Sequence, residues 1–133
     1  MRLRAAALAL SGLVLASSGA AATEPAVNLT ATPAVRSALR ATYLSHVTGV
    51  PRAKVKGPLP GTLYYARHRG REWAIAAFSR PLTGTTDQPE LFVRPVGGRW
   101  IDRGDTAGGL DVCAPSVPAP VLRVWGLFRR CDG

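Results

Sequence analysis

The residues on which catalysis and metal binding depend are scarce in this 133-residue sequence. It holds two histidines, two cysteines and eight acidic residues. His46 and His68 have no Asp, Glu or Cys at the spacing of a zinc site, and no Gly-x-Ser-x-Gly motif supplies a nucleophile. No glycine-rich run ends in the Gly-Lys-Ser/Thr of a phosphate loop. The sequence therefore predicts no metal and no cofactor, and it favours a non-catalytic protein over an enzyme.

Lysine is almost absent, although the chain carries a formal net charge of +9. Lys54 and Lys56 are its only lysines, and the other basic residues are arginines. A positive excess favours anionic partners. An arginine bias together with abundant Ala, Gly, Pro and Val is also typical of high-GC coding, which argues against nucleic acid as the partner. An extracellular protein and an anionic cell-envelope polymer both remain open as partners.

Long hydrophobic runs are missing, apart from a short one near the start of the chain. Residues 1–4 are positively charged, residues 5–16 are apolar and residues 17–22 are small. This pattern predicts a secretory signal peptide over residues 1–22. The apolar run is too short for a comfortable membrane span, and no later segment reaches the required length. We therefore expect a secreted protein, extracellular or associated with the cell envelope, with no transmembrane span after cleavage.

The two cysteines, Cys113 and Cys131, lie in the last quarter of the sequence. An even number of cysteines in an exported chain predicts a disulfide bond. The alternative, a reactive thiol, lacks a third cysteine or a Cys-x-x-Cys motif. Closing a loop of this size stabilises a fold by about 3 kcal/mol in the chain-entropy model.

The middle of the chain alternates between strand signals and turn signals. Strands are predicted from their β-forming residues over residues 62–67, 72–79, 91–94 and 99–102. His68-Arg69-Gly70-Arg71 and Gly97-Gly98 supply tight turns. The second of these strands is apolar on both faces, so we expect it to be covered on both faces or to lie centrally beneath a helix. Residues 81–89 form a long polar loop of the kind that often carries binding residues.

Two helices flank the predicted sheet. Thr32 and Pro33 predict an N-cap and first turn, and an apolar stripe follows at Val35, Leu39, Tyr43 and Val47. A second, shorter helix is predicted within residues 118–128, and residues 23–31 are expected to be disordered. Together these features predict one α+β domain over residues 32–131. Its N-terminal helix packs on a roughly four-stranded antiparallel meander sheet, and the disulfide tethers its short C-terminal helix.

In such a meander the first and third turns lie at the same end of the sheet. This arrangement predicts a basic tip, and with it a candidate binding surface made of Tyr64, Arg67, His68, Arg69, Arg71 and Arg99. The opposite end would gather acidic residues, namely Asp87, Glu90, Asp102 and Asp105. The plainer interpretation of the tip is a set of solvated turn residues. Asp102 and Asp105 could act as a pair in acid–base catalysis or could simply cap a turn.

Several of these motifs occur in a familiar order. The chain has Gly-Pro-Leu-Pro-Gly-Thr-Leu-Tyr-Tyr-Ala, then Trp-Ala-Ile-Ala, Gly-Arg-Trp, a Gly-Asp-Thr bend, a late Cys and Pro-Ala-Pro-Val. In this it resembles small secreted proteins of unknown function from high-GC Gram-positive bacteria. The order of helix and sheet is similar to cystatin-like and β-lactamase-inhibitor-like domains in architecture alone. Neither resemblance implies an activity or a catalytic residue.

Two classes of function follow from the sequence. The favoured class is a secreted, non-catalytic module that binds or inhibits a target or adheres to the envelope. The alternative is a small secreted hydrolase or isomerase that uses Asp102 or His46. A pocket that encloses either residue beside a second polar group would favour the enzyme, whereas a filled core with a flat, charged surface would favour the module.

Overall fold

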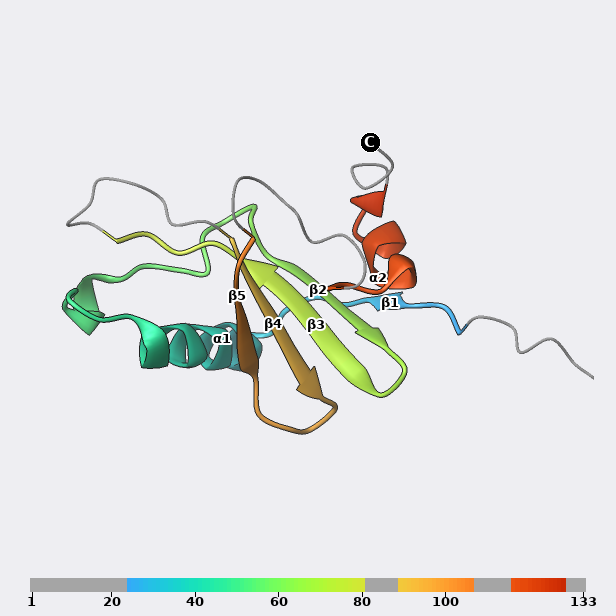
Figure 1. The fold of residues 1–133 in the computed structure, drawn as a ribbon, viewed down its shortest axis with the longest axis horizontal. Helices are drawn as coiled ribbons and strands as arrows, with labels where there is room; N and C mark the ends of the chain where they lie inside the picture. The colour runs from blue at the N-terminus through green and yellow to red at the C-terminus, as the bar shows by residue number, and fades with distance from the viewer. Residues whose placement is uncertain (1–23, 81–88, 107–115, 129–133) are drawn as a thin grey trace, which may run out of the picture.

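The structure, a computed structural model, describes residues 24–80, 89–106 and 116–128. Its centre is an antiparallel sheet in which five strands lie side by side in chain order (Figure 1). The strands are β1 Val27–Asn28, β2 Tyr64–His68, β3 Arg71–Ala76, β4 Glu90–Pro95 and β5 Ile101–Asp105. The helices are α1 Pro33–His46, a short 3-10 helix η1 Arg52–Lys54, and α2 Ala119–Val124. The predicted α+β class and antiparallel meander are confirmed.

The first strand was not expected, because residues 23–31 had been assigned to a disordered lead. Val27 and Asn28 pair with Arg67 and Ala66 of β2, and the Leu29 amide donates to the Tyr65 carbonyl at 2.8 Å. Both β1 residues are exposed, so their side chains carry no pattern of burial that the sequence could show. The sheet therefore has five strands rather than four.

Helix α1 begins and ends close to the predicted positions. The Thr32 Oγ1 accepts a hydrogen bond from the Val35 amide, which satisfies one of the unpaired donors of the first turn. Val35, Leu39 and Tyr43 of the apolar stripe are buried against the sheet. Tyr43 stacks on Phe78 with a ring-centroid distance of 4.1 Å. This stacking fixes the C-terminal half of α1 over the sheet.

Strand β3 is covered on both faces, as its sequence predicts. Ala74 and Ala76 belong to the core beneath α1, whereas Ile75 belongs to a second core on the other face. That second core contains Val121, Leu122 and Trp125 in and just after α2. The two helices therefore lie on opposite faces of the sheet (Figure 1).

Helix α2 is shorter than the stretch in which it was expected. It ends at Val124, and Gly126 adopts a positive φ of 73° that a continuing helix does not allow. Leu127, beyond the helix, is nevertheless buried against the sheet. The predicted disulfide between Cys113 and Cys131, and the signal peptide, lie outside the described residues.

Candidate functional site

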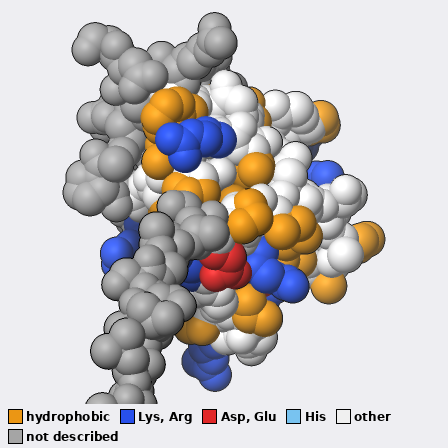
Figure 2. Space-filling view, turned by 90° about the vertical axis from the view of Figure 1, so that its right-hand side faces the viewer, with side chains coloured by type: hydrophobic (Ala, Val, Ile, Leu, Met, Phe, Trp, Pro, Cys, Tyr) orange, Lys and Arg blue, Asp and Glu red, His pale blue; other side chains and the backbone are white. Residues whose placement is uncertain are grey.

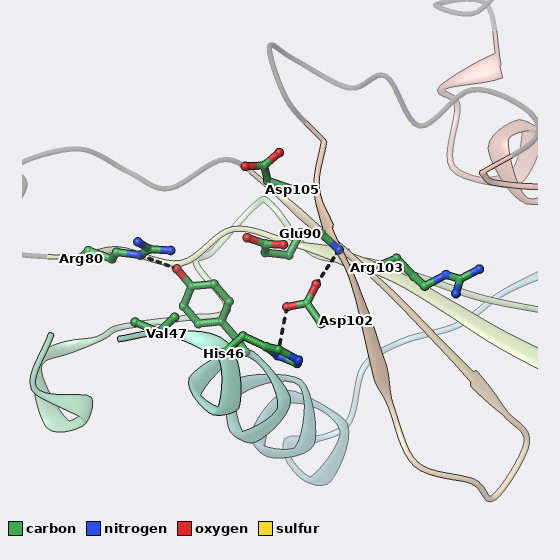
Figure 3. A pocket seen from close by; sticks show the side chains of 9 residues that line it. His46, Val47, Arg80, Glu90, Asp102, Arg103 and Asp105 are labelled. Atoms are coloured by element: carbon green, nitrogen blue, oxygen red, sulfur yellow. Dashed lines mark hydrogen bonds and ion pairs between the residues drawn. The ribbon is translucent and has the colours of Figure 1, made fainter. Parts of the chain in front are cut away.

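A pocket of about 410 Å³ lies where the C-terminal end of α1 meets strands β4 and β5 (Figure 3). Its walls come from segments far apart in the chain, and most of its side chains are polar. The lining residues are Tyr43, His46, Val47, Arg80, Glu90, Asp102, Arg103, Gly104 and Asp105. We call this the α1–β5 pocket.

Asp102 forms the middle of the pocket wall. Its side chain is only 7% exposed and points toward α1 (Figure 3). One carboxylate oxygen, Oδ1, accepts a hydrogen bond from the Gly104 amide at 2.8 Å. The other, Oδ2, lies 3.9 Å from the His46 Nδ1. Asp102 was expected to cap a turn, but it lies within strand β5, where its bond to Gly104 joins two residues of the same strand, and its side chain also faces the pocket.

The hydrogen bonds around His46 define which ring nitrogen carries the proton. Nδ1 lies 3.1 Å from the Thr42 carbonyl oxygen, which can only accept. Nδ1 is also 3.1 Å from the Ser45 hydroxyl, whose own hydrogen is directed to the Thr42 carbonyl at 2.6 Å. Both contacts assign the hydrogen to Nδ1 in the neutral ring. Nε2 then keeps its lone pair, which is the form that acts as a base.

The remaining polar groups enter the pocket from three different segments. Glu90, at the start of β4, is buried. Arg80 donates from Nε to the Tyr43 hydroxyl at 2.8 Å. Arg103 points away from the cluster, and Asp105 lies at its rim (Figure 3). The interior therefore combines two buried carboxylates with an imidazole, a guanidinium and a phenol.

The meander brings the β2–β3 and β4–β5 turns to one end of the sheet. Arg67, Arg69, Arg71 and Arg99 are all exposed at this end. Figure 2 looks at the molecule from the side of the β2–β3 turn and shows Lys and Arg side chains beside hydrophobic ones, with an acidic side chain among them. At the opposite end, Glu90 pairs in register with Asp105. Asp87 lies outside the described residues.

Two members of the predicted binding surface lie elsewhere than expected. Tyr64 is at the other end of β2, opposite Ile75, and its ring lies 5.9 Å from that of Trp125. His68 is at the tip, but its side chain is buried instead of exposed, because it is the last residue of β2 and faces the α2 side. The loop over residues 81–88 lies outside the part of the chain that the structure describes.

Glu72 is a residue that the sequence did not single out. It lies directly between Arg67 on β2 and Arg94 on β4, and its buried carboxylate accepts hydrogen bonds from both. Arg94 also stacks over Trp100, with its guanidinium carbon 4.5 Å from the ring centroid. We call Arg67, Glu72 and Arg94 the arginine ladder. The sequence held one signal for this contact, namely an acidic residue on β3 that lies opposite an arginine on each neighbouring strand.

The ladder shifts the ionisation of its carboxylate. Burial alone would raise the pKa of the Glu72 carboxyl, but hydrogen bonds from the two arginines and from Tyr65 outweigh that effect and lower the pKa. Burial and the hydrogen bond to Glu72 raise the pKa of the Tyr65 hydroxyl. Glu72 therefore stays negatively charged and forms ion pairs with both arginines.

Comparisons with known proteins gave no match to a family, to a curated protein or to a solved structure. Among the described residues, no group of three or more His, Cys, Asp or Glu side chains is placed to hold a metal ion. No helix in the same part of the chain is long and apolar enough to cross a membrane.

Proposed function

We propose that this protein is a secreted binding module that holds an uncharged, polyhydroxylated ligand, such as a saccharide unit, in the α1–β5 pocket. The observation that carries the proposal is the buried pair of carboxylates, Glu90 and Asp102, in the wall of an open pocket. A concave site with a few convergent polar groups is where small ligands generally bind.

The balance of charge in the pocket supports an uncharged ligand. Two interior carboxylates stand beside the Arg80 guanidinium and the His46 imidazole. A ligand with a net charge would therefore meet like charges as well as opposite ones, and like charges raise the cost of binding. Sugar hydroxyls can donate to the carboxylates and accept from the basic groups. Because a carboxylate offers about four lone-pair sites, one hydrogen bond from the Gly104 amide leaves Asp102 capacity for a ligand.

The experiment is a titration of the purified protein with a panel of neutral and N-acetylated mono- and disaccharides. We expect Asp102→Asn to weaken binding about 10- to 100-fold, because a hydrogen bond to a charged acceptor contributes about 1.5–3 kcal/mol. Asn keeps an oxygen for the Gly104 amide, so the fold is retained. Arg36→Gln, on the exposed side of α1, is the matched control and should bind like the wild type. Equal affinity of both variants and the wild type would refute the proposal.

The pocket also favours a second candidate, the small secreted hydrolase or isomerase. Asp102 and His46 lie in one pocket beside further polar groups, which is the arrangement expected of the enzyme. We place the enzyme second because the His46 Nδ1 lies 3.9 Å from the Asp102 Oδ2, beyond hydrogen-bond distance, and the His46 side chain is largely exposed. His46 can act as a general base through Nε2, while Asp102 stabilises the protonated ring that forms. Glu90 and Asp102 are also two carboxylates in one pocket, which is the residue type that glycoside hydrolysis uses.

Turnover distinguishes the two candidates. Each saccharide that binds is incubated with the wild type and with His46→Gln, and the products are followed by mass spectrometry. An enzyme would convert the ligand, and His46→Gln would lose conversion while retaining affinity. A binding module would leave every bound saccharide unchanged.

A further inference from the structure

A second, smaller pocket lies at the basic tip, at the far end of the sheet from Glu90 and Asp105. Its volume is about 240 Å³, and its walls are His68, Arg69, Arg71, Trp73 and Pro118. It opens on the α2 face of the β2–β3 hairpin, because His68 and Trp73 face that side. We call it the tip pocket. No lining residue is shared with the α1–β5 pocket.

Two of its walls carry nitrogens that the protein does not use. His68 is only 6% exposed, and its Nδ1 has no hydrogen-bond partner. The Trp73 indole Nε1 is likewise buried without a partner. Buried polar groups in proteins are nearly always hydrogen-bonded. The Trp100 and Trp125 indoles are also unpaired, so what distinguishes the tip pocket is that two unpaired nitrogens belong to residues of one pocket wall. An external partner for an indole N–H must accept, because the indole can only donate.

The charges at the tip pocket also favour a partner that accepts hydrogen bonds and carries negative charge. Arg69 and Arg71 are exposed on either side of the β2–β3 turn, and both line the pocket. Glu72 is the only acidic residue of the β2–β3 hairpin, but it faces the opposite side of the sheet and is held by the arginine ladder. Its charge is thus engaged elsewhere. The hairpin leaves two guanidiniums beside the pocket with no carboxylate of its own opposing them.

We propose that the tip pocket binds a phosphate group. Two guanidinium forks present paired N–H donors, and the buried indole and imidazole add further donors on turning toward the ligand. A phosphate has four oxygens and up to two negative charges, so it can accept from all of these groups at once. A carboxylate has two oxygens and a single charge, and it matches fewer of them. Arginine forks are suited to phosphate because their bonds to it are bidentate and charge-assisted.

The phosphate can be a free ion or part of a polymer. Arg99 is exposed at the same end of the sheet, outside the pocket, whereas Arg67 is paired with Glu72 on the opposite face. Arg99 would add affinity for a chain of phosphates that runs past the pocket, but not for a single ion. Inorganic phosphate and inorganic polyphosphate are therefore the two probes, and the contribution of Arg99 distinguishes their binding.

The test is a nuclear magnetic resonance titration of the ¹⁵N-labelled protein with each probe at constant ionic strength. We expect phosphate to shift the Trp73 indole and the amides of residues 68–71 in a saturable manner. Arg69→Gln/Arg71→Gln replaces two exposed side chains, so it should fold normally and bind phosphate at least tenfold more weakly. Arg99→Gln should change phosphate affinity less than twofold but weaken polyphosphate binding. Arg36→Gln, on α1, should change neither.

Two results would overturn the proposal. One is a phosphate titration in which the Trp73 indole resonance does not move. The other is an equal loss of phosphate affinity in Arg36→Gln and in the Arg69/Arg71 double variant. Such a result would mean that binding depends on the net charge of the protein and not on the tip pocket. His68→Gln gives an independent check, since it should weaken phosphate binding while the fold is verified by circular dichroism. Unchanged affinity in a folded His68→Gln would also count against the proposal.

Discussion

Replacing Glu72 by glutamine removes the charge from the centre of the arginine ladder while keeping the size of the side chain. Arg67 is half exposed, so solvent screens its ion pair with Glu72 and this contact adds little to stability. Arg94 is mostly buried, and its charged hydrogen bond contributes about 1.5–3 kcal/mol. The substitution also leaves Arg94 without its counter-charge. We expect Glu72→Gln to lower the free energy of unfolding by about 2–3 kcal/mol at pH 7.

The effect depends on pH in a defined direction. The pKa of Glu72 is lower in the folded state than in the unfolded chain. Its contribution is therefore fully present above the unfolded value of about 4.3 and is lost as the pH falls through the folded value. The difference in stability between the wild type and Glu72→Gln should thus be constant near neutral pH and should shrink in acid.

Urea unfolding, followed by the fluorescence of the three tryptophans, measures this difference. With an m-value of about 2 kcal/mol/M, the midpoint of Glu72→Gln should fall by roughly 1 M at pH 7. Glu24→Gln changes an exposed glutamate and should shift stability by less than about 0.5 kcal/mol. The reasoning is refuted if Glu72→Gln matches the wild type at pH 7, or if its deficit is the same at pH 3.

Two further pairs of substitutions, each a test with its control, examine the packing of the core. A Cβ on Gly57 would lie 2.6 Å from the Phe78 Cδ1, whereas at Gly49 no atom lies within 4 Å; both have positive φ. Gly49→Ala should lower the free energy of unfolding by about 1–2 kcal/mol through its backbone conformation alone. Gly57→Ala should lower it by about 1–3 kcal/mol more, because the added Cβ meets Phe78. Urea unfolding midpoints measure both changes. Leu39→Ala should cost about 2–5 kcal/mol by the same assay. Val27→Ala is the control for Leu39→Ala: Val27 is 54% exposed, so its substitution should cost under about 0.5 kcal/mol. Similar losses of stability for Leu39→Ala and Val27→Ala would contradict the difference in burial between these two residues.

The parts of the fold that the sequence predicted are those with local or periodic signals. The N-cap at Thr32 and the stripe from Val35 to Tyr43 are such signals, and they place α1 correctly. Strand alternation likewise assigns Ala74 and Ile75 to opposite faces. The two-residue β1 has no such signal, because its pairing with β2 depends on backbone hydrogen bonds rather than on its side chains.

The sites depend on contacts between distant segments. His46 and Asp102 were each named as candidates, but they come together only because the end of α1 packs beside β5. His68 was interpreted as a turn residue, since its burial depends on where β2 ends and on α2 covering that face. Tyr64 was assigned to the tip, although four residues along a strand place it at the other end.

The central claim is that the α1–β5 pocket binds an uncharged saccharide unit, and a ¹⁵N–¹H correlation spectrum recorded against the saccharide panel tests it most directly. We expect at least one saccharide to shift the amides of Val47, Asp102 and Gly104 in a saturable manner. Asp102→Asn should reduce these shifts at the same ligand concentration, because it weakens binding about 10- to 100-fold. A panel in which no saccharide moves any amide of the pocket would contradict the claim.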